Sequence, residues 1–420
     1  SLSLSLSLCL SLHLLFCKLA VNFDDNSENL SKIAGRGGAP MQKKMTAKRT
    51  PPLSLLRRRN GGFKLLTVVA IIFCVFGLWK LQSTSEVLSP NSTRRSRRVD
   101  TSFEGTPKIA FLFLARRHVP LDFIWGTFFE GVDAAKYSIY IHSQPGFVFD
   151  ESTTRSALFY GRQLSNSIQV AWGESSMIQA ERLLLDAALE DPANQRFVLL
   201  SDSCVPLYNF SYVYNYIMES PRSFVDSFLD KKEGRFNPQM SPVIPKDKWR
   251  KGSQWFTLIR RHAEVVVDDE LVFPIFKKFC KRRPPIDGRK GKLNLKLQKQ
   301  HNCIPDEHYV QTLLAMMGLE DQVERRTLTY TLWNESASKM EGKGWHPVTF
   351  SYSTASPQRI KEIKDINHVY YETEYRTEWC RTNATSVPCF LFARKFSEGA
   401  AMRLLSEGFG PSPLLDKDTR

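Results

Sequence analysis

Unbroken apolar runs alternate with amphipathic stretches after the first hundred residues. The runs KIAFLFLA, YSIYIH and FVLL cover residues 108–115, 137–142 and 197–200, and they have the composition of strands buried on both faces. Between them, residues 121–132 form a predicted helical stretch, and residues 177–189 place Met177, Ala180 and Leu184 on one helix face. This order predicts an α/β domain with a mostly parallel sheet and crossover helices.

The carboxyl ends of these strands mark the expected site, because ligands of parallel sheets bind there. Those ends place Ala115–Arg117, His142 and Asp202 near it. No GxGxxG or GxxxxGK[ST] motif occurs, which disfavours a dinucleotide or P-loop site. Asp202 is followed by Ser203 and Cys204, so this strand end lacks the second carboxylate of an Asp-x-Asp metal motif.

A separate apolar segment, LLTVVAIIFCVFGLW, begins at Leu65 and is bracketed by Lys64 and Lys80. It is shorter than the ~20 residues of an ordinary span, but snorkelling lysines extend it, and we expect a single N-terminal transmembrane helix over 65–81. The stretch before it is basic, so the positive-inside rule predicts a cytosolic tail over 41–64 and a luminal remainder, a type II topology. A buried core helix is the alternative.

The flanks of the anchor have their own signatures. Residues 1–12 read SLSLSLSLCLSL, which a CT-repeat in the nucleic acid would encode, so we expect 1–40 to be translated leader and Met41 to be the start. A signal peptide is the rival interpretation. Residues 82–106 are polar and rich in Ser and Thr, as in a flexible stem, and residues 411–420 are expected to form a C-terminal tail.

Charge and cysteine content narrow the class of protein. The chain has 58 Lys+Arg against 43 Asp+Glu, and its 42% hydrophobic content excludes global disorder. Much of the basic excess flanks the apolar segment, and a luminal domain does not meet nucleic acid, so no nucleic-acid partner is expected. Five of the eight cysteines follow the anchor, where the lumen is oxidising. An odd number leaves at least one unpaired, and Cys380 with Cys389 is a candidate bridge.

The segment CIPDEHYVQTLLAMMG carries the strongest candidate for chemistry. Pro305 and Asp306 are typical of a helix start, and Gly318 is typical of its end. Glu307 then falls in the first turn, where the helix dipole favours a carboxylate. A carboxylate at the edge of a cleft can act as a general base, whereas a capping acid is the alternative.

Seven segments together resemble the core-2/I-branching β-1,6-N-acetylglucosaminyltransferase family, and more closely its plant branch. They are FLFLARRHVPLDFIW, IHSQPGF, LLSDSCVPLYNF, GRFNPQMSPVIPKDKWRKGSQWF, CIPDEHYVQTLL, TLWNES with HPVTF, and CFLFARKF. They fall within a luminal domain expected over 107–410. The resemblance implies a GT-A-like, inverting transferase that uses a UDP-sugar and needs no metal or other cofactor.

The resemblance also implies roles for individual residues. Glu307 is similar to the base that deprotonates the acceptor hydroxyl, and Lys395 to a lysine that contacts the diphosphate in place of metal. An arginine shares that task in the family, and Arg376 is the first choice here, with Arg381 the second. His142 is expected near the uridine.

The acceptor side is assigned in the same way. Arg235 and Trp333 resemble acceptor-binding groups of the family, and an indole face suits stacking on a sugar. Ser143 and Gln144 depart from the pattern, because many relatives have an acidic residue at this place. That departure bears on nucleotide recognition and hence on the donor.

The resulting expectation is a single-pass Golgi membrane enzyme that transfers a sugar, GlcNAc by resemblance, to a glycan or glycoprotein hydroxyl. Two alternatives stay open. One is a glucuronosyltransferase acting on cell-wall arabinogalactan, which extra cations near the donor sugar would favour. The other is a non-catalytic Golgi membrane binding module with the same fold.

Overall fold

The computed structural model describes residues 103–282, 302–333, 346–382 and 385–408. All of them belong to one compact unit, Arg98–Arg420. The predicted leader, cytosolic tail, anchor and C-terminal tail lie outside the described residues, as does nearly all of the stem. Within the described ranges, no helix has the length and apolar character needed to cross a membrane.

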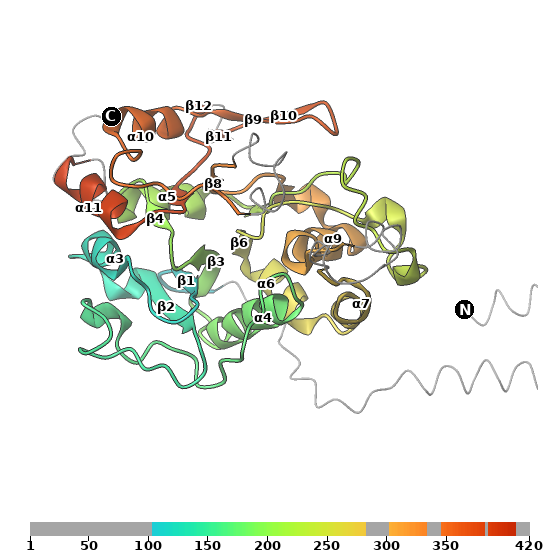
Figure 1. Ribbon diagram of the computed structural model, residues 1–420, viewed down its shortest axis with the longest axis horizontal. Coiled ribbons are helices and arrows are strands. Elements are labelled where there is room, and N and C mark those ends of the chain that lie inside the picture. Colours follow the sequence, from blue (N-terminus) through green and yellow to red (C-terminus); the bar gives the residue numbers. More distant parts are fainter. Residues whose placement is uncertain (1–102, 283–301, 334–345, 383–384, 409–420) are drawn as a thin grey trace, which may run out of the picture. The chain divides into compact units, whose positions relative to one another are not determined.

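A six-stranded sheet runs through the centre of the domain (Figure 1). Its spatial order is β2 (Tyr137–His142), β1 (Lys108–Leu114), β3 (Asn194–Ser201), β6 (Thr257–Ile259), β5 (Ser223–Phe224) and β7 (Val323–Glu324). β1 pairs in parallel with β2 and β3, and β5 pairs in parallel with β7. β6 is antiparallel to both of its neighbours. The predicted strands β1 to β3 and the mostly parallel sheet are confirmed, with β6 as the reversed strand.

Both faces of β1 are buried, which explains its unbroken apolar sequence. Ile109, Phe111 and Phe113 belong to one core, and Ala110 and Leu112 belong to the other. The first core is built with α3 (Asp122–Phe129), α5 (Phe210–Glu219), α10 (Pro357–Lys364) and α11 (Glu398–Ser406). The second is built with α4 (Ser176–Leu189), α6 (Arg260–Asp268), α7 (Val272–Phe279) and α9 (Tyr309–Met316). The predicted helices after β1 and before β3 correspond to α3 and α4.

The C-terminal part of the chain forms smaller sheets, and one of them lies near the end of β3. β13 (Phe392–Arg394) lies between β4 (Val205–Pro206) and β8 (Thr329–Thr331). The backbone N–H of Phe396 donates to Ser203 O, 2.9 Å away, just past the end of β3. Two antiparallel pairs follow α10 along the chain: β9 (His368–Tyr371) with β10 (Arg376–Trp379), and β11 (Arg381–Thr382) with β12 (Thr385–Ser386).

Two disulfides crosslink the described residues. Cys380 bonds to Cys389, as predicted, and Cys280 bonds to Cys303. Cys204 is free and buried. The helix expected to start at Pro305 is interrupted: Pro305–Glu307 form a 3₁₀ turn, and α9 begins only at Tyr309. Glu307 therefore ends the 3₁₀ turn instead of lying in the first turn of α9.

Candidate functional site

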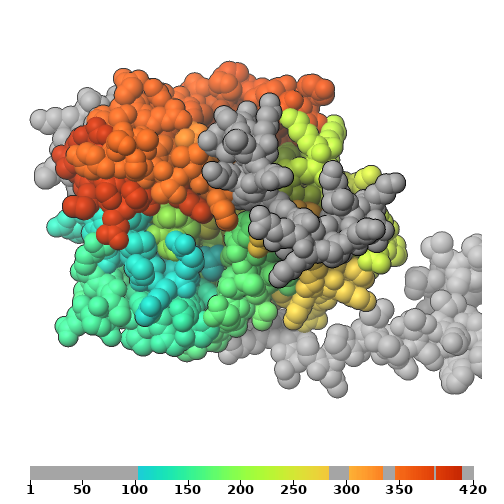
Figure 2. Space-filling model, in the orientation of Figure 1, coloured from blue at the N-terminus to red at the C-terminus, as the bar shows by residue number. Residues whose placement is uncertain are grey.

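One large cavity, of about 1070 Å³, opens at the carboxyl ends of β1, β2 and β3. Its other walls come from the 3₁₀ turn Pro305–Glu307, from the end of β13 and from β9. Figure 2 shows the cyan-to-green N-terminal half of the domain meeting the orange C-terminal part across one face, and both parts contribute to the cavity walls. Five predicted site residues line it: Glu307, Lys395, His142, Arg235 and Trp333.

Glu307 is held at the cavity wall through both its backbone and its side chain. Its carbonyl accepts hydrogen bonds from the Gly252 N–H and from Nε2 of Gln311, each at 2.9 Å. Its Oε2 accepts from Nη1 of Arg235 at 2.5 Å. Gly252 is itself packed against Asp226, because a Cβ there would lie 1.9 Å from the carbonyl oxygen of Asp226. The carboxylate therefore projects from a backbone that is fixed on two sides.

Arg235 belongs to a chain of four alternating charges along the cavity wall. Its guanidinium also pairs with Glu233, and Glu233 pairs in turn with Lys251. The Arg235 backbone N–H donates to Asp230, which also accepts from Nε1 of Trp249 at 3.2 Å. Alternating signs leave each charge compensated, so Arg235 can hold Glu307 without an unpaired ion in the wall.

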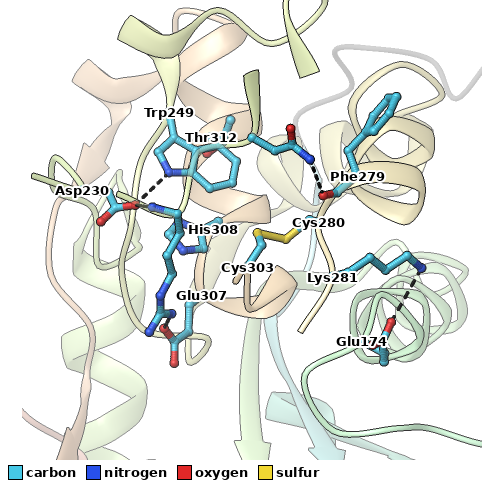
Figure 3. Close-up of a disulfide and its surroundings, with 12 residues drawn as sticks. Glu174, Asp230, Trp249, Phe279, Cys280, Lys281, Cys303, Glu307, His308 and Thr312 are labelled. Carbon is cyan, nitrogen blue, oxygen red and sulfur yellow. Dashed lines mark hydrogen bonds and ion pairs between the residues drawn. A yellow bond between two sulfur atoms is a disulfide. The ribbon is translucent and has the colours of Figure 1, made fainter. Parts of the chain in front are cut away.

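A buried aromatic stack supports the residue after the candidate base. The ring of His308 stacks on Trp249 with centroids 4.4 Å apart, and Figure 3 labels both residues. Its Nδ1 lies 2.8 Å from the carbonyl oxygen of Arg250, which accepts, so Nδ1 carries the proton. Burial lowers the pKa of His308 to about 3, and the charge of Arg235 acts in the same direction. His308 is thus a neutral side chain that packs next to the site.

Asp306 is a cavity residue that the sequence reasoning used only as a helix-start signal. Burial raises its pKa to about 7, and the neighbouring charge of Glu307 adds to the rise. Behind it, burial raises the pKa of Glu181 on α4 well above its ordinary value, while Gln254 donates to Glu181 at 2.7 Å. The carboxyl beside Glu307 is therefore easily protonated, and the local negative charge is smaller than the count of acids implies.

Two cations at the end of β13 also line the cavity. Lys395 is the predicted one, and burial together with the charges of Arg394 and Arg116 lowers the pKa of its amine. Arg394 was not predicted, although it precedes Lys395 directly in FARKF. Its guanidinium lies 4.3 Å from the ring centroid of Trp255, and its Nε donates to Oγ of Ser201 at 3.4 Å. The end of β13 thus supplies two adjacent positive charges.

The strand ends complete that side of the cavity. Nε2 of His142 accepts from the Ile168 N–H at 3.0 Å, and burial lowers the pKa of the ring to about 4, so the imidazole is neutral. Asp202 accepts from Nε of Arg116 at 3.0 Å. Within the described ranges, no three His, Cys, Asp or Glu side chains are arranged to hold a metal ion.

Trp333 lies at the cavity with 49% of its surface exposed, so it is not a core residue. Arg376 and Arg381 are absent from the described residues that line the cavity. Arg376 bonds to Glu374 at 2.8 Å and to Glu378, donates to Ser227 O, and packs 4.1 Å from the ring centroid of Tyr371. Because Tyr371 itself lines the cavity, the Arg376 guanidinium lies behind the wall. Arg381 packs against Trp379 instead.

Comparison with known proteins gives two findings. Residues 109–364 match the family described as Core-2/I-Branching enzyme. The chain is also 57% identical over 305 residues to a protein of rice, Oryza sativa subsp. japonica, named Glycosyltransferase BC10. That similarity covers 72% of this chain and 76% of the rice protein.

Proposed function

The chain belongs to the Core-2/I-branching enzyme family and is a glycosyltransferase, and we propose that it moves GlcNAc from a UDP-sugar to a glycan hydroxyl with inversion. The observation that carries the proposal is the arrangement of one cavity. Glu307 lines it from the 3₁₀ turn, and Lys395 with Arg394 lines it from the end of β13. A base and a cationic pair in one cavity match the two needs of the reaction: proton removal from the acceptor and charge stabilisation on the leaving group.

In the proposed reaction, the acceptor hydroxyl oxygen attacks the anomeric carbon from the face opposite UDP. The carboxylate of Glu307 takes the hydroxyl proton as the new glycosidic bond forms. The bond between the anomeric carbon and the phosphate oxygen breaks, and UDP leaves with the bonding pair. Lys395 and Arg394 stabilise the negative charge that develops on the diphosphate, which is the part a metal ion plays in other transferases.

Arg235 and Trp333 belong to the acceptor side of this proposal. Arg235 fixes the direction of the Glu307 carboxylate through its hydrogen bond at 2.5 Å. The exposed indole of Trp333 offers a flat face to a sugar ring. We place the uridine near His142, where the neutral ring adds no charge. Arg376 stays a rival to Arg394 as the second diphosphate cation.

Glucuronosyl transfer is the second candidate function, and Arg394 is the observation that favours it. A guanidinium binds the carboxylate of a uronic acid in a paired geometry. If Arg394 faces the donor sugar instead of the diphosphate, a UDP-uronic acid would be selected over UDP-GlcNAc. The choice between the two sugars is open to direct measurement.

We also propose that the enzyme acts in the Golgi lumen, anchored in the bilayer through residues 65–81. The basic flank before this segment supports that orientation. The two disulfides support an oxidising compartment, since such bonds are rare in the cytosol.

The test is a donor panel with the detergent-solubilised full chain. UDP-GlcNAc, UDP-glucuronic acid, UDP-galactose and UDP-glucose are each incubated with glycan acceptors in EDTA, and UDP release is followed. We expect release with UDP-GlcNAc, a product of inverted anomeric configuration, and the same rate when Mn²⁺ replaces EDTA. Preference for UDP-glucuronic acid would replace the first candidate by the second. UDP binding without turnover for any donor would favour a binding module.

A further inference from the structure

Two connections tie residues near Glu307 to the end of α7. Cys280, the residue that follows α7, bonds to Cys303, which lies four positions before Glu307. The carbonyl of Phe279 accepts from Nδ2 of Asn237 at 3.1 Å, two positions after Arg235. Figure 3 shows Glu307 and His308 to the left of the disulfide, with the Glu307 carboxylate the lower of the two. The candidate base and its arginine partner are thus both tied to one helix end.

The same helix end supports the turn through aromatic packing. Phe276 of α7 stacks on Trp249 with centroids 5.4 Å apart, and the Trp249 ring stacks in turn on His308. Cys280, Cys303, Phe276 and His308 are fully buried. If Cys303 moved, the 3₁₀ turn would be pushed against these close-packed side chains.

A series of backbone contacts connects the disulfide to the 3₁₀ turn. The Cys303 N–H donates to Lys281 O at 3.1 Å, beside the disulfide. Next, the Glu307 N–H donates to Ile304 O at 3.1 Å, and Pro305 fixes the backbone between them. Only Ile304, Pro305 and Asp306 separate the crosslinked residue from Glu307, which leaves little freedom for the carboxylate.

We propose that the Cys280–Cys303 disulfide is a positioning element for the Glu307 carboxylate, setting its place opposite Arg235 and the acceptor hydroxyl. This inference rests on the proposed function, in which Glu307 is the base. Neither cysteine lines the cavity or touches substrate, so both act through the 3₁₀ turn. A base moved by about 1 Å loses up to about 100-fold in rate without any loss of donor binding.

The second disulfide provides a matched control. Cys380 and Cys389 are also fully buried and also crosslink the domain, but they join the end of β10 to the segment before β13. No contact of either cysteine reaches the turn Pro305–Glu307 in the described hydrogen-bond network. Removing this bond should lower the unfolding temperature as any lost crosslink does.

The experiment compares four variants of the full chain in detergent: C280A/C303A, C380A/C389A, Glu307→Gln and Pro305→Gly. For each, kcat, the KM of the UDP-sugar and the Kd of UDP are measured. We expect C280A/C303A to lower kcat by about 10- to 100-fold while KM of the donor and Kd of UDP stay within about twofold. C380A/C389A should keep more of its kcat despite a lower unfolding temperature.

The outcomes distinguish a failure of the disulfide's positioning role from a failure of Glu307 as the base. An inactive Glu307→Gln beside a fully active C280A/C303A would overturn the positioning role and leave the base intact. Equal losses of kcat in both double variants would also overturn it, because generic destabilisation would explain them. Ordinary turnover in Glu307→Gln would overturn the proposed function together with this inference. If C280A/C303A does not fold, Pro305→Gly decides: it keeps the bond but loosens the link, and an unchanged kcat contradicts the proposal.

Discussion

Nη1 of Arg235 donates to Oε2 of Glu307 across 2.5 Å, joining the loop before residue 240 to the turn before α9. Both side chains line the cavity, and both are partly exposed to it. The family resemblance assigned Arg235 to acceptor binding, whereas the structure gives it a direct contact with the candidate base. The two roles are compatible, because a base must face the acceptor hydroxyl that it deprotonates.

Replacing Arg235 by Ala should lower kcat by about 10- to 100-fold, because a charge-assisted hydrogen bond to the carboxylate is lost. Steady-state kinetics with the acceptor varied measure this change. Arg222→Ala is the control, since Arg222 pairs with Glu324 at 3.5 Å outside the cavity. An unchanged kcat with a raised acceptor KM would restrict Arg235 to acceptor binding.

Arg394→Gln should weaken UDP binding by roughly tenfold or more, because a hydrogen bond between a guanidinium and an anion contributes about 1.5–3 kcal/mol. Arg376→Gln should change UDP affinity little, since its guanidinium already bonds to two carboxylates behind Tyr371. Calorimetric titration of UDP compares the two directly. The opposite ranking would mean that Arg376 leaves its acidic partners when the nucleotide binds.

Gly252→Ala should reduce both stability and turnover. The new Cβ would lie 1.9 Å from Asp226 O and 3.0 Å from Nε2 of Gln311, which also holds the Glu307 carbonyl. We expect a loss of about 1–3 kcal/mol in the free energy of unfolding, as for overpacked sites. Gly399→Ala is the control: its Cβ would meet nothing closer than 3.6 Å, in a helix where Ala is preferred. Equal stability of both variants would contradict the close packing of Gly252 against Asp226.

Acid should destabilise the domain partly through His308. Its folded pKa of about 3 lies below the ordinary value of 6.5, so between these values the unfolded chain binds the proton and the folded chain does not. Stability from this group is complete above pH 6.5 and is lost as the pH falls toward 3. The variant His308→Asn should therefore show a shallower dependence of unfolding free energy on pH in this window.

Exposed His368 offers the comparison for that experiment, and His368→Asn measures the effect of removing a histidine from the surface instead of from the buried stack. Denaturant unfolding at several pH values measures both variants. Asp306 acts with the opposite sign, because its raised pKa of about 7 makes stability fall as the pH rises from about 4 to 7. A steeper acid dependence in His308→Asn would contradict the assignment.

The sequence was sufficient for the parts of the fold whose signals are local. β1, β2 and β3 were predictable because strands buried on both faces must be apolar throughout. β6 was not, because Thr257–Ile259 are three residues whose antiparallel pairing is fixed by contacts with β3 and β5. The 3₁₀ turn was missed for a similar reason: Pro305 signals a start, but the break at His308 coincides with a tertiary contact, its stacking on Trp249, that spacing does not reveal.

The residues of the candidate site also fall into those that the sequence identified and those that it did not. Glu307 and Lys395 stand in motifs that resemblance identified, and the structure places both in one cavity. Arg394 has no signal of its own beyond adjacency to Lys395, and its placement follows from β13 pairing between β4 and β8. The position of Arg376 could not be read from spacing, because its contact with Tyr371 is a tertiary one.

In the proposed reaction Glu307 removes the acceptor proton and Lys395 binds the diphosphate, and one pair of variants tests these separate roles most directly. With UDP-GlcNAc and a glycan acceptor, kcat and the Kd of UDP are measured for Glu307→Gln and Lys395→Ala beside the parent protein. We predict that Glu307→Gln lowers kcat by roughly 10²- to 10⁴-fold with the Kd of UDP unchanged, and that Lys395→Ala raises the Kd of UDP. Ordinary turnover in Glu307→Gln, or unchanged UDP affinity in Lys395→Ala, would contradict the account.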